Sequence, residues 1–225
     1  MIRTRVEASL RAVAASFAAV GLVAPGAPGG SVDDPPASAG IELRWGLLFA
    51  ALDRRGDDRF VEAVELIYEG YLLHYRSDRL GLVDEGDRQT ALLAGDVFYA
   101  RGLDLIAARG DVGSVALLTR LMSACSCLRS LHAPFSDDDA LWAYTTAGLA
   151  ALRVGAPAAS VGAFFDDLDA ALAGGAPADV SRRAASAAAA LVLPDPAPLD
   201  AAFVALTLAA ASAPADGPVV PSPQR

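Results

Sequence analysis

The sequence contains no lysine, so arginine supplies all 18 of its strongly basic side chains. This absence excludes chemistry that needs a side-chain amine, such as Schiff-base formation or a lysine that cradles a phosphate. Positive charge is scarce overall, because the formal net charge is −9. Nucleic acid and anionic lipid surfaces repel an acidic chain, and we expect neither as a partner.

Cysteine is nearly absent, and the two that occur, Cys125 and Cys127, lie two residues apart in an apolar stretch with helical spacing. At that spacing the side chains point to different sides of a helix, which excludes an unstrained disulfide. They also lack the spacing of a zinc site. We interpret them as buried, reduced thiols of a cytoplasmic protein.

Long apolar runs are missing too. None reaches the roughly 18 residues that a membrane-spanning helix needs, so we expect no transmembrane segment. Three arginines precede the apolar residues 12–24, an arrangement also found in secretory signals. An amphipathic helix over residues 1–23 fits better, because the apolar positions recur at helical spacing. These positions are Ile2, Val6, Leu10, Val13, Phe17 and Val20.

Alanine, the strongest helix former, is abundant in a composition that is 54% apolar. Apolar residues recur mostly with helical spacing and seldom with the two-residue period of strands, so we predict an all-α protein. A linker rich in proline and glycine is expected over residues 24–40, a helical domain over 41–212 and a disordered tail over 213–225. Within the domain we predict helices over residues 41–54, 59–79, 89–108, 111–132, 139–154, 158–173, 178–193 and 197–212.

The predicted helix 59–79 carries apolar residues on two sides, which indicates a central helix. It ends in a charged cluster formed by His74, Arg76, Asp78 and Arg79. This cluster is the rim of a ligand site, the remains of one, or the solvated end of a helix.

Two groups of acidic residues have structural interpretations. Glu62, Glu65 and Glu69 share one strip of the helix 59–79. They could bind a cation, but a polar stripe or a subunit contact fits better. Ser136 is a good N-cap for the next helix, and Asp137–Asp139 would then lie in its first turn, where the helix dipole favours carboxylates. We therefore prefer capping to a metal site for these three aspartates.

Three stretches, in this order, resemble the trans-prenyltransferases, the polyprenyl diphosphate synthases with the all-helical isoprenoid-synthase fold. GIELRWGLLFAAL (40–52) is similar to the family's Gly-Lys-Arg-x-Arg-Pro segment and the helix after it. ELIYEGYLLH (65–74) is similar to its Glu-Leu-Ile-His helix, and ALLAGDVFYARGLDLIA (91–107) to its Ala-x-Leu-x-Gly-Asp helix. The resemblance covers roughly residues 1–155 and implies a truncated orthogonal or antiparallel helical bundle of the isoprenoid-synthase type.

The sequence departs from the family at the residues that carry its chemistry. The family has an Asp-Asp-x-x-Asp run after the helix histidine, whose carboxylates hold Mg²⁺ on the leaving diphosphate. Here Tyr75, Arg76 and Arg79 stand at those three positions, and only Asp78 is acidic. Two arginines would repel the ion that the site should receive.

Other pocket positions of the family survive only in part. Arg44 remains from its isopentenyl diphosphate site, where positions 41–42 now hold Ile and Glu, and Arg88 is the remnant of an Arg-Arg pair. Asp96 matches the family, and we expect it to form an internal ion pair with Arg88 or Arg44. His74 is expected to be a buried histidine with satisfied hydrogen bonds.

A second acidic group, Asp166, Asp167 and Asp169, is superficially similar to the family's later Asp-Asp-x-x-Asp box. Its spacing differs, so the three carboxylates point to different sides of the predicted helix. They mostly oppose its apolar stripe, which indicates a solvated face, with a reworked metal site as the alternative.

The resemblance and its departures together suggest a non-catalytic relative of the polyprenyl synthases, similar to component I of heptaprenyl diphosphate synthases. Such a pseudoenzyme would act as an accessory subunit and need no cofactor, and its expected partner is a catalytic prenyl synthase or a second copy of itself. By resemblance alone, VFYARGLDLIA (97–107) is a candidate interface. The alternatives are a divergent Mg²⁺-dependent prenyltransferase or terpene-type enzyme, and a carrier of an apolar ligand.

Overall fold

The computed structural model of the protein describes residues 2–19, 41–53, 55–84, 86–174, 179–191 and 193. Across these residues it contains helices and no strand, which confirms the predicted all-α class. The helices are α1 Ile2–Ala19, α2 Trp45–Asp53, α3 Asp58–Tyr75, α4 Arg88–Ala107, α5 Val112–Ser130, α6 Phe135–Arg153, α7 Ala158–Ala173 and α8 Val180–Ala189. The predicted linker 24–40, helix 197–212 and tail 213–225 lie outside the described residues.

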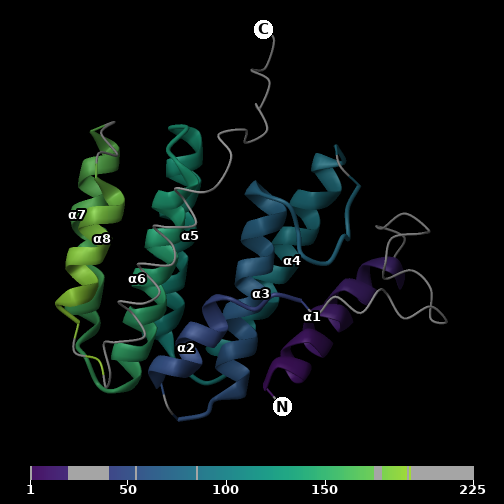
Figure 1. The fold of residues 1–225 in the computed structure, drawn as a ribbon, viewed down its shortest axis with the longest axis horizontal. Coiled ribbons are helices and arrows are strands. Elements are labelled where there is room, and N and C mark those ends of the chain that lie inside the picture. Colours follow the sequence, from purple (N-terminus) through teal and green to yellow (C-terminus); the bar gives the residue numbers. More distant parts are fainter. Residues whose placement is uncertain are drawn as a thin grey trace, which may run out of the picture.

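Two helices form the centre of the bundle. Every residue of α3 from Phe60 to Leu73 is buried, as its two apolar stripes predicted, and α3 packs against α1, α2 and α4. Every residue of α6 from Asp138 to Ala151 is buried as well, and α6 packs against α2, α5, α7 and α8. The short helix α2 contacts both central helices and lies across the lower part of the view in Figure 1.

Glycines allow α3 and α4 to approach with their backbones nearly touching. A Cβ atom added to Gly70 would lie 2.9 Å from the carbonyl oxygen of Gly95. One added to Gly102 would lie 2.8 Å from the carbonyl oxygen of Ala63 and 2.4 Å from Cγ1 of Ile67. Any larger residue would push the helices apart, so these glycines allow the close packing of α3 against α4.

Aspartates begin three of the helices. The side chains of Asp57, Asp87 and Asp111 accept hydrogen bonds from backbone N–H groups three residues on and cap α3, α4 and α5. The predicted Ser136 cap is wrong: α6 begins at Phe135, with Pro134 at the N-cap, two residues before Ser136, and no side-chain cap bond.

The cysteines are free thiols, as predicted, with Cys125 buried and Cys127 half-buried in α5. Among the described residues α5 is the one helix whose length and hydropathy would also suit a membrane span. It buries Leu117, Leu118 and Leu121 in the protein core, and a core helix meets the same criteria.

We predict that Gly102→Ala lowers the free energy of unfolding by about 2 kcal/mol, because the added methyl group overpacks the α3–α4 contact. Gly113→Ala is the matched control, since its Cβ would meet no atom closer than 3.8 Å. The control should leave stability unchanged or raise it slightly through helix propensity. Urea unfolding followed by circular dichroism measures both, and equal losses in the two variants would contradict this account.

Candidate functional site

The charged cluster after α3 does not continue the helix, which corrects the predicted end at residue 79. α3 stops at Tyr75, and the backbone N–H of Arg76 closes its last turn on the carbonyl oxygen of Leu72. The chain then reverses, because the carboxylate of Asp78 accepts hydrogen bonds from the N–H groups of Leu80 and Leu82 at 3.0 and 2.9 Å. This turn brings the guanidinium of the next residue, Arg79, back over α3.

Arg79 joins two buried carboxylates of α3. Its Nη1 lies 2.6 Å from Oε2 of Glu65, and its Nε lies 2.6 Å from Oε2 of Glu69. Neither glutamate side chain has any exposed surface, so burial raises the pKa of Glu69 against the opposing effect of Arg79. Glu65 and Glu69 of the strip therefore face neither a metal ion nor a partner subunit in this structure, because Arg79 of the same chain is their cation.

Glu65 also fastens the segment before α2. Its Oε1 accepts hydrogen bonds from the backbone N–H groups of Arg44 and Gly46, at 2.8 and 2.7 Å. The side chain of Glu62, the third residue of the strip, accepts a hydrogen bond from the hydroxyl of Ser9 in α1. The strip thus connects α3 to two other parts of the chain.

A second buried carboxylate lies at the start of α6. Asp138 is fully buried; its Oδ2 accepts a hydrogen bond from the Tyr71 hydroxyl at 2.5 Å and lies 3.0 Å from Nε of Arg129. Burial raises its pKa to about 6, although Tyr71 and Arg129 both act to lower it. Asp138 lies in the first turn as predicted, but it does not face solvent as a capping carboxylate would.

Its neighbour Asp139 forms ion pairs with two arginines from distant parts of the chain. Nη1 of Arg44 lies 3.4 Å and Nη1 of Arg76 lies 3.5 Å from the same oxygen, Oδ1. We use the name charge cluster for eight residues that lie together here: Arg44, Glu65, Glu69, Arg76, Arg79, Arg129, Asp138 and Asp139. It holds four carboxylates and four guanidinium groups.

Aromatic side chains adjoin the charge cluster. Trp45 stacks on Trp142 with ring centroids 6.1 Å apart, and Tyr68 meets Trp142 edge-on at 5.1 Å. The Arg44 guanidinium lies 4.7 Å from the Trp45 ring centre, within cation–π range. The cluster is therefore packed on the core and held in a fixed arrangement.

Two sequence-predicted pocket residues meet at the end of α3, but not as expected. Nε2 of His74 lies 3.2 Å from Oδ1 of Asp96, and the Asp96 side chain is 70% exposed. The predicted internal ion pair of Asp96 with Arg88 or Arg44 is wrong, because Arg88 donates to the last carbonyl oxygens of α3 and Arg44 turns to Asp139. Burial lowers the pKa of His74, which is half-buried, so its imidazole is uncharged at neutral pH.

The aspartates of α7 lie on its solvated side, opposite the buried apolar stripe of that helix. Arg120 of α5 joins two of them: Nη1 lies 2.7 Å from Oδ1 of Asp166, and Nη2 lies 2.8 Å from Oδ2 of Asp169. The prediction that the three carboxylates point to different sides is therefore wrong for Asp166 and Asp169, because one guanidinium lies between them. Across all described residues, no group of three or more His, Cys, Asp and Glu side chains is arranged to hold a metal.

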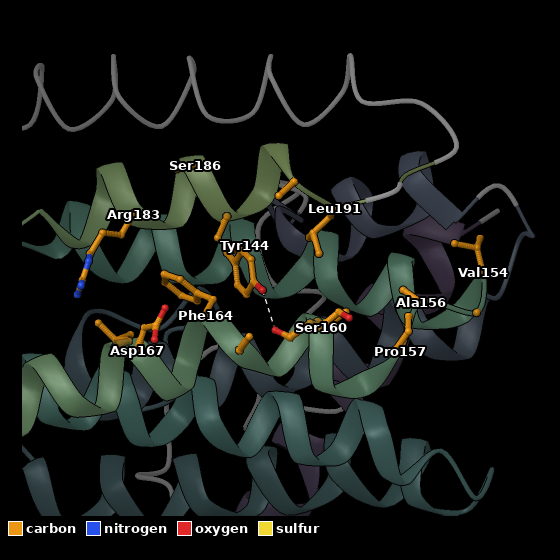
Figure 2. A pocket seen from close by; sticks show the side chains of 16 residues that line it. Tyr144, Val154, Ala156, Pro157, Ser160, Phe164, Asp167, Arg183, Ser186 and Leu191 are labelled. Atoms are coloured by element: carbon orange, nitrogen blue, oxygen red, sulfur yellow. Dashed lines mark hydrogen bonds between the residues drawn. The ribbon is translucent and has the colours of Figure 1, made fainter.

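Asp167 borders a groove of about 860 Å³ between α6, α7 and α8. Figure 2 shows Arg183 and Asp167 at one end of it and Val154 at the other, with the ring of Phe164 beside Tyr144. The hydroxyl of Tyr144 donates a hydrogen bond to the carbonyl oxygen of Val161 at 2.7 Å, so its proton is already engaged by a residue that also lines the groove. The groove lies apart from the charge cluster and contains none of its residues.

No protein-family model, curated protein or solved structure matches this chain. The charge cluster is therefore interpreted from its own geometry. Of the residues expected at a pocket, the structure places Arg44 in the cluster together with Arg76 and Arg79. Sequence reasoning missed that Glu65, Glu69 and Asp138 belong to it as buried acids, and the available signal was a glutamate pair four residues apart in a helix with apolar residues on both sides.

We predict that Arg79→Met lowers the free energy of unfolding by about 3 to 5 kcal/mol at pH 7.5, because two buried carboxylates lose their counter-ion. Arg101→Met is the control, since Arg101 is half exposed and pairs only with exposed Asp104. This control substitution should lower the free energy of unfolding by less than about 1 kcal/mol. If urea unfolding showed similar losses of unfolding free energy for the two variants, the buried pairing of Arg79 would contribute no more to stability than an exposed ion pair, and the prediction would be wrong.

We also predict that the free energy of unfolding falls as the pH rises from about 4 to about 6. In this window the folded state keeps the Asp138 proton that the unfolded chain has already released, since the folded pKa is about 6. The contribution is complete below the window, is lost above it, and amounts to at most about 3 kcal/mol. Asp138→Asn should flatten the profile, whereas Asp104→Asn, which changes an exposed carboxylate, should leave it unchanged. An unaltered slope in the Asp138 variant would contradict this assignment.

Proposed function

We propose that this protein is a non-catalytic relative of the polyprenyl diphosphate synthases that acts as an accessory subunit through protein–protein contact. One observation carries the proposal: the end of α3, where the resembling enzymes hold Mg²⁺, contains guanidinium groups already paired with the chain's own carboxylates.

Prenyl transfer requires the loss of diphosphate from an allylic substrate. Clustered carboxylates bind the Mg²⁺ that neutralises this leaving group. Here Glu65 and Glu69 are fully buried around Arg79, and Asp139 faces two arginines. Freeing the oxygens of Glu65 and Glu69 for a metal would leave the nearly buried guanidinium of Arg79 without a partner. The arrangement favours a structural role for the acids over catalysis.

An accessory subunit needs a surface for its partner, and α4 offers one. Leu92, Leu93 and Val97 are 37%, 49% and 43% exposed on this helix, which is unusual for large apolar side chains. Val97 is the first residue of the stretch 97–107 that the sequence resemblance marks as a candidate interface, and Leu92 and Leu93 precede that stretch on the same helix. Apolar side chains in this setting are suited to the core of a protein–protein contact.

We predict that the purified protein does not elongate farnesyl diphosphate with isopentenyl diphosphate and Mg²⁺. Mixed with a catalytic polyprenyl synthase of the same host, it should form a complex and change the product chain length, both measured by chromatography. Val97→Glu should prevent both effects, because a charge in an apolar interface is costly.

Val112→Glu is the matched control, since Val112 is 75% exposed at the first residue of α5. This variant should bind as the wild type does. Elongation by the protein alone would establish the divergent-enzyme alternative and end this proposal, as would the failure of every host polyprenyl synthase to bind it.

A further inference from the structure

One acidic side chain lies within the exposed apolar surface of α4. Asp96 is four residues from Leu92 and three from Leu93, so these side chains share one side of the helix. Val97 follows Asp96 directly and is exposed at the edge of the same surface, and the Asp96 side chain itself is 70% exposed. We call these four residues the α4 face. A partner that covers the α4 face must therefore also cover a carboxylate.

The arginines of α4 do not neutralise this carboxylate. Arg88 donates to the last carbonyl oxygens of α3, and Arg101 pairs with Asp104 further along α4. Among the described residues, the one basic side chain within ion-pair distance of Asp96 is His74, whose Nε2 lies 3.2 Å from Oδ1. Since this imidazole is uncharged at neutral pH, the negative charge of Asp96 stays uncompensated there.

The imidazole of His74 is fixed beside Asp96. It packs against α4 at Gly95, where an added Cβ atom would lie 2.1 Å from Cδ2 and 2.6 Å from Nε2 of the ring. Its other ionisable neighbours are Tyr99 and Tyr75, with ring centres 5.0 and 5.6 Å from its own. The buried Nε2 atom makes no aligned hydrogen bond with any described residue. A proton bound there would satisfy this nitrogen through the neighbouring carboxylate.

Opposing effects set the protonation of His74. Burial lowers its pKa and Arg88 acts in the same direction, whereas Asp96 and the backbone of Leu92 act to raise it. Water around the exposed Asp96 carboxylate weakens its attraction for the imidazolium. A partner that displaced this water would strengthen the attraction and favour the charged ring.

We propose that protonation of His74 controls binding at the α4 face: the imidazolium pairs with Asp96 and cancels its charge, so the face binds an apolar partner surface more tightly as the pH falls. This inference rests on the proposed accessory function, because it concerns the regulation of the same surface. A lone carboxylate beneath an apolar partner is costlier than one paired with a cation. Binding of the partner and uptake of a proton are therefore coupled.

The direction of the pH dependence follows from this coupling. The pKa of His74 is higher in the complex than in the free protein, so affinity rises as the pH falls below the pKa in the complex. It levels off below the pKa of the free protein. A difference of about one unit between the two pKa values makes affinity about tenfold higher at about pH 5.5 than at about pH 7.5.

Variants of the full chain separate this pair from other titrating groups. Affinity for the host polyprenyl synthase and retention on uncharged phenyl-agarose are compared at about pH 7.5 and about pH 5.5. Asp96→Asn should bind tightly at both values, because its charge is gone. His74→Gln should bind weakly at both, because no proton neutralises Asp96. Asp138, which also titrates near pH 6, is present in every variant and cancels in the comparison.

His132→Asn is the matched control, because it changes the only other histidine of the chain. His132 has a positive φ of 56°, a backbone conformation that asparagine tolerates. This variant should show the same rise in affinity as the wild type. NMR titration of the imidazoles tests the pairing without a partner: Asp96→Asn should lower the pKa of His74, since Asp96 acts to raise it.

Three results would overturn the inference: an unchanged His74 titration in Asp96→Asn, the wild-type pH dependence in His74→Gln, or no gain of affinity and retention in Asp96→Asn at neutral pH. Asp96→Asn alters an exposed side chain and decides the matter alone if His74→Gln does not fold. If no host synthase binds at any pH, the accessory function fails, while retention and the His74 titration still decide this inference. A complex that forms independently of pH would leave the accessory function intact.

Discussion

The pairing of Arg79 with Glu65 and Glu69 is the constraint on which much of the fold depends. Two carboxylates without exposed surface are tolerable in a helical core only with a counter-ion, and the chain supplies it by ending α3 four residues before Arg79. The same Glu65 fixes the backbone before α2. One buried ion pair thereby sets the end of the central helix, the turn after it and the entry to α2.

This use of carboxylates is the physical basis of the functional interpretation. Oxygen ligands that meet in an open cleft attract divalent cations, but oxygens buried against guanidinium groups cannot exchange their partner without exposing unpaired charge. In each of α3, α6 and α7, at least one acid of the groups that might have formed a metal site contacts an arginine: Glu65, Asp138 and Asp166.

The members of the charge cluster differ in how tightly they are enclosed. Arg79 and Arg129 are nearly buried and serve packing, whereas Arg44 and Arg76 are part-exposed and share one carboxylate. Burial thus divides the four arginines of the charge cluster into an inner pair, Arg79 and Arg129, and an outer pair, Arg44 and Arg76.

Helical periodicity determined the all-α class, the approximate extent of each described helix and the central place of α3, because these follow from neighbours three and four residues apart. The spacing of Cys125 and Cys127 likewise sufficed to predict free thiols. Only the tertiary structure decided which charges meet. Arg44 and Asp139 are 95 residues apart, and the turn at Asp78 moved Arg79 off the predicted helix. Such pairings depend on how helices cross and on which side chains burial forces together, and no local pattern along the chain contains that information.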